Sequence, residues 1–125
     1  MMSRTPRRQT TRTGRRDARL PSLSKRRLDE LVEEAIVDAY GESEQQVGLL
    51  CMLQQHLAVP FTTEILGTAV RVERVDLNDA DEIVGICRRG QQRQKIPILD
   101  LPLPSPPPHG WEWIAAYRHW ARGGR

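Results

Sequence analysis

Residues 61–101, FTTEILGTAVRVERVDLNDADEIVGICRRGQQRQKIPILDL, decide the fold class of this chain. Apolar and polar residues alternate here in three short runs, as they do in half-buried strands, at 61–65, 70–72 and 96–98. Turn-forming residues separate the runs, namely Gly67, Asn78–Asp79 and Gly90. The stretch predicts about four short antiparallel strands, either as an open meander or as a curled, barrel-like sheet. Pro97 indicates that the last strand is either an edge strand or bulged.

Two helices are predicted before this sheet. Apolar side chains recur every three or four residues in 25–39, and Ser24 is suited to cap that helix. Gly41 is expected to end it, and Ser43 with Gln46 forms a capping-box pattern that starts a second helix. That helix should end before Pro60. We expect its buried side to consist of Val47, Leu50, Cys51, Leu53 and Leu57, so that the two helices form a hairpin.

The C-terminal part predicts a spacer and a third helix. Residues 101–110, LPLPSPPPHG, favour an extended conformation. Residues 111–122 favour a short helix whose Trp113, Tyr117 and Trp120 share one face, which we expect to dock on the sheet. The predicted fold class is therefore α+β, with an N-terminal helical hairpin packed on a small antiparallel β-sheet and a C-terminal helix.

The formal net charge of +3 hides an asymmetry along the chain. Residues 1–27 contain ten Lys or Arg and one acidic residue, whereas residues 28–82 contain thirteen acidic residues and two Arg. Because residues 1–24 have almost no large apolar side chains to bury, we predict a disordered basic tail there and a single domain at 25–125. Such a tail either attracts anionic partners without specificity or is simply solvated.

The sequence lacks the residues that several classes of function require. No run approaches the roughly 18 apolar residues of a membrane-spanning helix, and the start of the chain has no apolar signal-peptide segment. The three histidines lack zinc-ligand spacing, and Cys51 and Cys87 lie in apolar runs where we expect buried, reduced thiols. We therefore predict a cytoplasmic protein that contacts no membrane, and no enzyme, since no nucleophile, base and orienting group can be named together.

Oxygen-bearing side chains cluster at two predicted turns. The first cluster contains Asp38, Glu42 and Glu44, and the second contains Asp76, Asn78, Asp79, Asp81 and Glu82. Calcium prefers about six to eight hard oxygen ligands from carboxylates, carbonyls and water. Turns supply such a mixture, because their backbone carbonyls are free. The alternative is that both turns are merely solvated, since Asp and Asn are ordinary turn residues.

The run 76–87, DLNDADEIVGIC, does not fit an EF-hand. Asp76 and Asn78 match the first and third loop positions. Asp81, however, stands where a glycine is needed, and Cys87 stands where a bidentate glutamate is needed. A calcium site in this run is therefore of another kind.

Longer motifs of the chain resemble a known family. They are LDELVEEAIVDAYGESEQ (28–45), LAVPF (57–61), ILGTAVRVERVDLNDADEIVGICRRG (65–90), IPILDLPLP (96–104) with PPP (106–108), and WEWIAAYRHWARG (111–123). In these motifs the chain resembles the bacterial calcium-binding proteins typified by CcbP, which have no EF-hand, and the similarity covers roughly residues 26–123.

This resemblance implies a helical part on a small β-sheet, with Ca²⁺ held by clustered acidic turns, in a protein that buffers or senses cytosolic calcium. The ligand set that it implies consists of seven carboxylates: Asp38, Glu42, Glu44, Asp76, Asp79, Asp81 and Glu82. Asp38 is the first candidate, because it follows the apolar stripe of the first predicted helix.

A nucleic-acid or protein-partner binding module is the second hypothesis. The basic tail would supply affinity for an anionic partner, and four cations around the Gly90 turn would extend the positive surface: Arg88, Arg89, Arg93 and Lys95. A steep loss of binding with added salt would distinguish this hypothesis from calcium binding. The sequence leaves the oligomeric state open.

Overall fold

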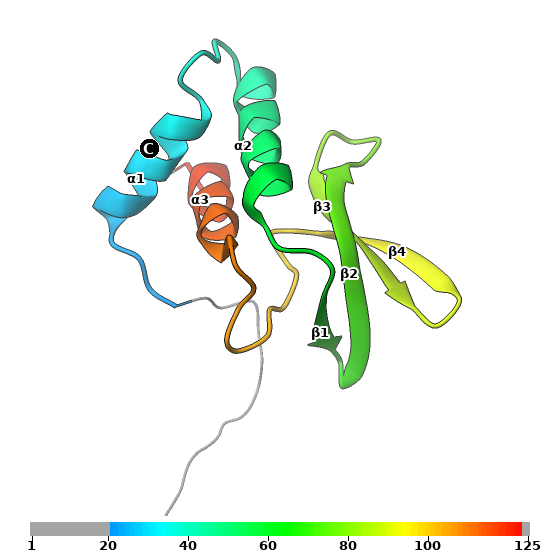
Figure 1. The fold of residues 1–125 in the computed structure, drawn as a ribbon. Helices are drawn as coiled ribbons and strands as arrows, with labels where there is room; N and C mark the ends of the chain where they lie inside the picture. Colours follow the sequence, from blue (N-terminus) through cyan, green and yellow to red (C-terminus); the bar gives the residue numbers. More distant parts are fainter. Residues whose placement is uncertain (1–20, 124–125) are drawn as a thin grey trace, which may run out of the picture.

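The computed structural model describes residues 21–123 of the chain. Within this range the order of elements is α1, α2, β1, β2, β3, β4 and α3 (Figure 1). Their bounds are α1 Lys25–Ala35, α2 Glu42–His56, β1 Phe61–Ile65, β2 Thr68–Leu77, β3 Ile83–Arg89, β4 Gln92–Pro97 and α3 Trp111–Ala121. Residues 1–20 of the predicted disordered tail lie outside the described residues.

The strands form an open antiparallel sheet in the order β1-β2-β3-β4, so each strand pairs with its neighbours along the chain. Because β1 and β4 are free edges, the barrel-like alternative is wrong and the meander is confirmed. Pro97 ends the edge strand β4, as predicted. The register shifts between Val72 and Arg74, which places Glu73 in a β-bulge of β2.

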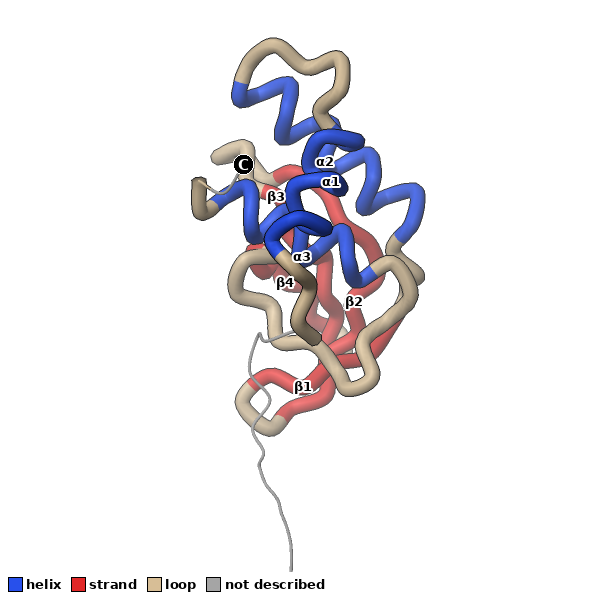
Figure 2. The backbone as a smooth tube through the Cα atoms, turned by 90° about the vertical axis from the view of Figure 1, so that its left-hand side faces the viewer, coloured by secondary structure: helices blue, strands red, loops and turns tan. Residues whose placement is uncertain are grey.

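All three helices lie on one side of the sheet, and Figure 2 shows them in front of the strands. Helix α2 contacts strand β2, and α1 and α3 contact α2 and each other. The core lies between the two layers and includes Leu31, Leu49, Leu53, Val72, Ile83, Cys87, Ile98, Leu101 and Ile114. The predicted α+β class, with helices at both ends of the chain and an antiparallel sheet between them, is confirmed.

Helix α1 begins where the sequence predicts and ends earlier. The Ser24 hydroxyl accepts a hydrogen bond from the backbone N–H of Arg27 at 3.0 Å, which confirms the predicted N-cap. The helix ends at Ala35 rather than at Ala39. The next two residues, 36–37, are both β-branched and have low helix propensity, which accounts for the early end.

Helix α2 begins one residue before its predicted N-cap. Gly41 is the N-cap and makes no side-chain capping bond, so the predicted capping box of Ser43 and Gln46 is wrong. The glutamates of the first turn replace it, because negative charge near a helix N-terminus is favourable. Gly48 of this helix lies so close to the carbonyl of Ala35 that a Cβ atom would overlap it, which lets α1 and α2 pack closely.

The buried side of α2 differs in part from the prediction. The leucines behave as expected, since Leu50, Leu53 and Leu57 are buried, and Leu49 joins them. Val47 and Cys51 are exposed, so the predicted burial of this pair is wrong. They are four residues apart and therefore share a side of the helix, and that side faces solvent.

Helix α3 carries the predicted buried aromatic residues and packs on α1 and α2. Its Tyr117 also reaches the sheet, where the hydroxyl bonds to the backbone of Ile83 in β3. Trp113 and Tyr117 are buried, and so is Arg118, of which 4% is exposed. The Arg118 guanidinium donates to the carbonyl of Ile98 from Nε (3.1 Å) and Nη2 (2.9 Å), and to that of Leu101 from Nη2 (2.7 Å). Arg118 therefore fixes α3 to the segment that follows β4.

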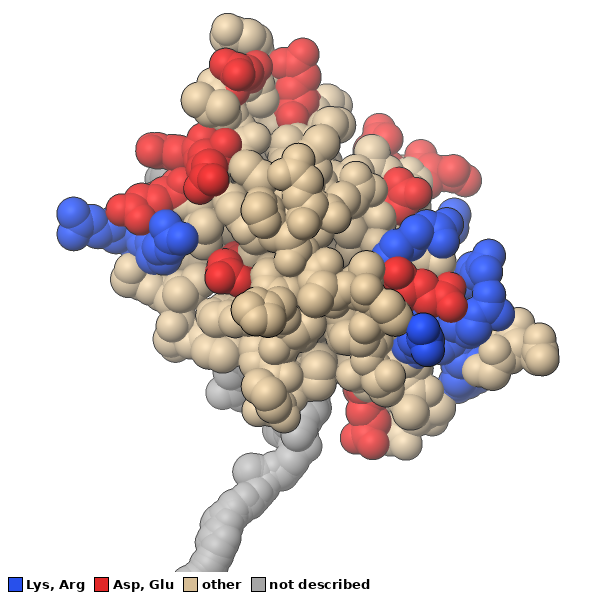
Figure 3. Space-filling model, in the orientation of Figure 1, with Lys and Arg blue, Asp and Glu red and all other residues tan. Residues whose placement is uncertain are grey.

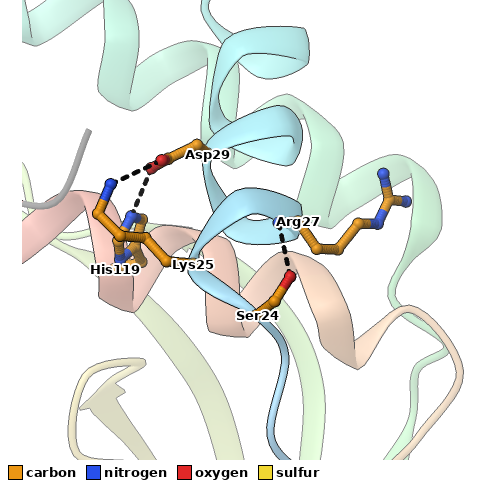
Figure 4. Close-up of polar contacts among 5 residues, drawn as sticks. All are labelled: Ser24, Lys25, Arg27, Asp29 and His119. Carbon is orange, nitrogen blue, oxygen red and sulfur yellow. Dashed lines mark hydrogen bonds and ion pairs between the residues drawn. The ribbon is translucent and has the colours of Figure 1, made fainter.

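A polar contact joins α1 to α3 (Figure 4). The Asp29 carboxylate accepts a hydrogen bond from the Lys25 ammonium at 2.8 Å, and its other oxygen lies 2.8 Å from His119 Nε2. The hydrogen-bonded Lys25, and next His119, hold the pKa of Asp29 below its ordinary value. The contact therefore favours a negative charge at Asp29 in the folded protein.

We expect Asp29→Asn to make folding less sensitive to acid. Because the folded protein lowers the pKa of Asp29, the unfolded chain binds this proton more readily. The contribution of Asp29 to stability is therefore full above the unfolded value of about 4 and is lost as the pH falls through the lower folded value. Urea unfolding between about pH 6 and pH 2 should show a shallower loss of stability in Asp29→Asn than in the parent protein.

The control for this prediction is Glu34→Gln, which removes an exposed carboxylate from the same helix. Its acid profile should follow that of the parent. An Asp29→Asn profile as steep as the parent profile would show that the contact between α1 and α3 contributes nothing to the pH dependence.

Candidate metal site between two turns

A pocket of about 690 Å³ lies where both acidic turns meet the end of α3. We call it the turn pocket and define it by its lining. The helical connection and the start of α2 contribute Tyr40, Gly41, Glu42, Gln45 and Gln46. The β2–β3 turn contributes Ala80, Asp81 and Glu82, and α3 and the residues after it contribute Tyr117, Trp120, Ala121 and Gly123. Residues far apart in the sequence thus share one site.

The β2–β3 turn is organised by Asn78. Its side-chain oxygen accepts hydrogen bonds from the backbone N–H groups of Ala80 (2.8 Å) and Glu82 (2.9 Å), as in an Asx-turn. Its side-chain amide donates to a carboxylate oxygen of Glu82 at 3.0 Å. Asp81 adopts a positive φ of 63° within this turn. Asn78 therefore fixes both the backbone of the turn and the orientation of the Glu82 carboxylate.

The connection between α1 and α2 is fixed in a similar way by an acidic residue. A carboxylate oxygen of Glu44 accepts a hydrogen bond from the backbone N–H of Tyr40 at 2.8 Å. The backbone N–H of Gln45 donates to the carbonyl of Gly41 at 2.9 Å, which closes the first turn of α2. Glu42, between these residues in the sequence, lines the turn pocket.

Two glutamines join the three walls of the turn pocket. The Gln46 side-chain amide of α2 donates to the backbone carbonyl of Asp81 in the β2–β3 turn. Trp120 Nε1 of α3 donates to the side-chain oxygen of Gln45 at 2.9 Å. These bonds hold the start of α2 between the acidic strand turn and the end of α3.

Two stacked aromatic rings, those of Tyr117 and Trp120, belong to the α3 wall, with centroids 6.0 Å apart. Burial raises the pKa of the Tyr117 hydroxyl, and the charge of Glu82 raises it further. The hydroxyl is therefore neutral at physiological pH and offers the pocket a dipole rather than a charge.

Of the seven predicted carboxylates, the structure brings three to the turn pocket: Glu42, Asp81 and Glu82. The other four do not line it: Asp38, Glu44, Asp76 and Asp79. Asp38, the first candidate, is exposed in the turn after α1. Figure 3 shows the acidic side chains gathered over α1, the helical connection and the β2–β3 turn. The four outer carboxylates therefore surround the pocket region with negative charge.

The groups of the turn pocket that could act as metal ligands suit a hard cation. They are carboxylates from both turns, the side-chain amides of Gln45 and Gln46, and backbone groups of the turns. Calcium accepts such mixed oxygen ligands with flexible geometry and completes its shell with water. Among residues 21–123 no three His, Cys, Asp or Glu side chains already converge as a metal-holding group. Binding would therefore require the carboxylates of the two turns to move towards each other.

Sequence reasoning missed the other lining residues, among them Gln45, Gln46, Tyr117 and Trp120. Gln46 matched a capping box, and the two aromatic residues matched a core-facing stripe. The contact between Trp120 and Gln45 joins residues 75 positions apart, which no local spacing can indicate. The one available signal was the position of both glutamines directly after the first acidic cluster.

The remaining metal-binding and nucleophilic candidates have other environments. The His56 ring stacks on Trp113 with centroids 5.7 Å apart, and His119 contacts Asp29. Cys87 is buried, as predicted, and burial raises the pKa of its thiol to about 11, which disfavours the reactive thiolate.

None of the helices formed within residues 21–123 has the length and apolar character needed to cross a bilayer.

Comparison with known proteins identifies the family and the fold of the chain. The model of a CcbP family, described as calcium binding, matches residues 29–121. No curated protein matches the chain. Among solved structures, the crystal structure of CcbP from Anabaena has the same fold, with a TM-score of 0.65 and 18% sequence identity, and the match covers 86% of this chain and 99% of that chain. Because the family match extends over most of its length, the chain belongs to the CcbP family of calcium-binding proteins.

Proposed function

We propose that the chain binds Ca²⁺ in the turn pocket, as a cytoplasmic calcium buffer or sensor. The observation that carries this proposal is the meeting of both acidic turns at one pocket, with Glu42 on one side and Asp81 and Glu82 on the other. The hydrogen bond from Gln46 to Asp81 already holds the two sides together. The family to which the chain belongs supports the choice of ion.

The seven carboxylates have two kinds of role in this proposal. The three that line the pocket offer oxygen ligands, and water and backbone carbonyls complete the shell. The four outer carboxylates, Asp38, Glu44, Asp76 and Asp79, raise the local concentration of cations through their field. Added salt should screen this outer contribution, because the Debye length is about 8 Å at physiological ionic strength.

Charge neutralisation is the mechanism of binding. Carboxylates of the two turns repel each other without the ion, and Ca²⁺ replaces this repulsion with attraction. Because the ligands must be deprotonated, acid weakens binding and binding releases protons. The described part of the chain has two free cysteines, which fits a reducing compartment such as the cytoplasm.

The proposal predicts that Glu42→Gln combined with Glu82→Gln weakens Ca²⁺ binding about tenfold or more, because one ligand is lost from each turn. Glutamine keeps the size of each side chain and removes only its charge. Calorimetric titration of chelator-treated protein, with about millimolar Mg²⁺ present as the competing hard cation, measures the change.

The control for this test is Glu33→Gln combined with Glu34→Gln, which removes two exposed charges from α1. It should change the Ca²⁺ affinity about threefold or less, through the long-range field alone. Equal losses in the two double variants would assign the affinity to net charge and contradict a site in the turn pocket. A parent protein without saturable binding would contradict the proposed function itself.

A further inference from the structure

A second surface of strong charge lies on the sheet, on the face that the helices do not cover. Val72 and Cys87 are paired across β2 and β3 and belong to the core, so the residues next to them point to the opposite face. On that face Arg71 pairs with Arg88, and Arg88 pairs with Arg93. Three guanidinium groups thus follow one another directly across β2, β3 and β4.

The adjacent cross-strand row adds two more cations. Ile86 lies two residues before Arg88 on the same face and pairs with Arg74 on one side and Lys95 on the other. Ile86 is only 4% exposed, although it lies outside the core between the layers. The two flanking cations are placed to cover Ile86, because side chains of this kind lay their aliphatic stems over apolar surface and keep the charge in water.

Glu73 is the carboxylate that bonds directly to one of these cations. Glu73, in the β-bulge, accepts a hydrogen bond from Arg88 Nε at 3.0 Å. The pKa of Glu73 is lowered chiefly by Arg88, and further by Arg93 and Arg71. All three guanidinium groups of the first row therefore surround the same carboxylate, and their charge exceeds its own. Like charges at directly opposite positions destabilise a sheet, so an external anion would relieve a cost that the fold carries.

The chemistry of this face favours phosphate over a protein partner. Protein interfaces depend on aromatic or apolar anchors, and the exposed large apolar residues among 21–123 all lie elsewhere: Val37, Tyr40, Val47, Val59 and Leu66. Four of the five cations are arginines, whose planar guanidinium suits phosphate oxygens. Strands β2, β3 and β4 contain no aromatic residue, so they offer no ring on which a nucleic-acid base could stack.

We propose that the sheet face of Arg71, Arg74, Arg88, Arg93 and Lys95 binds the phosphate backbone of duplex nucleic acid without sequence preference. Figure 3 shows the positive charges of this region beside the strands and the acidic charges concentrated towards the upper end of the molecule. A duplex on the sheet face would therefore be attracted there and repelled from the acidic turns. This interaction is separate from the turn pocket and does not depend on calcium binding.

The test is the binding of a short fluorescein-labelled duplex DNA to the full chain, followed by anisotropy in the presence of a calcium chelator. The combined variant Arg71→Gln, Arg93→Gln and Lys95→Gln should weaken binding about tenfold at about 50 mM salt. The slope of log affinity against log salt should fall by about two to three, because each neutralised phosphate contributes about 0.9. A second duplex of different sequence should give the same values.

The matched control is Lys25→Gln, Arg26→Gln and Arg27→Gln, which removes three charges from exposed positions at the start of α1. This control should retain the salt slope of the parent to within about one unit. Equal effects of the two triple variants, or no binding by the parent at about 50 mM salt, would overturn the proposal. Equal binding of poly-glutamate would also overturn it, by showing a face that attracts any polyanion. Unchanged circular dichroism would show that the sheet-face variant is folded.

Discussion

Arg118→Ala is expected to destabilise the protein by about 3–5 kcal/mol, a large part of the about 5–15 kcal/mol that holds a small domain folded. Arg118 is almost fully buried and makes three hydrogen bonds to the carbonyls of Ile98 and Leu101. Burial lowers the pKa of its guanidinium to about 10, which leaves it charged at neutral pH. Alanine would remove these charge-assisted bonds and leave a cavity at the base of α3. Urea unfolding at neutral pH measures the loss.

Arg118→Lys tests whether the charge alone is responsible. Lysine keeps the charge but cannot present a planar group to both carbonyls, so we expect a loss between those of the parent and Arg118→Ala. Arg122→Ala, one turn later and exposed, should change stability by about 0.5 kcal/mol or less. An Arg118→Ala protein within about 1 kcal/mol of the parent would contradict the role of this residue as the anchor of α3.

Gly110→Ala is expected to destabilise the protein by about 2–4 kcal/mol, from a positive φ and a backbone overlap together. Gly110 is the N-cap of α3 and has φ of 85°. A Cβ atom at this position would overlap the backbone carbonyl of His56 at the end of α2. The backbone N–H of Ala58 also donates to the carbonyl of His109 at 2.8 Å, so this approach of α3 to α2 is fixed on both sides. Thermal or urea unfolding measures the effect.

Gly67→Ala separates the two causes. Gly67 has a similar φ of 80° in the β1–β2 turn, but a Cβ atom there would meet nothing within 4 Å. We expect it to cost only the conformational term, about 1–2 kcal/mol. The difference between the two variants then measures the close approach of α2 and α3. Equal losses at both glycines would show that the approach is not tight.

The fold was largely predictable because its signals are local. Alternation at 61–65 and 70–72 and the turn residues Gly67 and Gly90 are sufficient to predict an antiparallel meander, which the structure confirms. The openness of the sheet was not predictable, because closure depends on how far β1 and β4 curl towards each other. Helix ends were also uncertain, since Gly41 and Ser43 both suit an N-cap and only the packing decides between them.

For the candidate site, the sequence indicated the kind of side chain but not how the two turns meet. Acidic residues at two turns indicate hard-oxygen chemistry, and three of the seven line the turn pocket. Their meeting depends on tertiary contacts, such as the one between Gln46 and Asp81, which are 35 positions apart. Arg118 was missed for the same reason: a cation within an apolar helix is expected at the surface, and only the path of residues 98–101 explains its burial.

The two charged regions of the molecule give it separate electrostatic faces. In the two proposals, the turn pocket and its outer carboxylates attract cations and the sheet face attracts anions. Within the positive face, Glu73 offsets part of the charge through its hydrogen bond with Arg88. The net charge of +3 therefore describes neither face, and the distribution of charge determines which ligand each one attracts.

The most direct test of the calcium site is a titration of ¹⁵N-labelled protein with Ca²⁺, followed by amide chemical shifts. Binding in the turn pocket predicts that amides of residues 40–46 and of residues 80–83 shift together and give one dissociation constant. The indole N–H of Trp120, which bonds to Gln45, should shift with them. Shifts confined to one of the two turns, or two unrelated dissociation constants, would contradict a single calcium site between them.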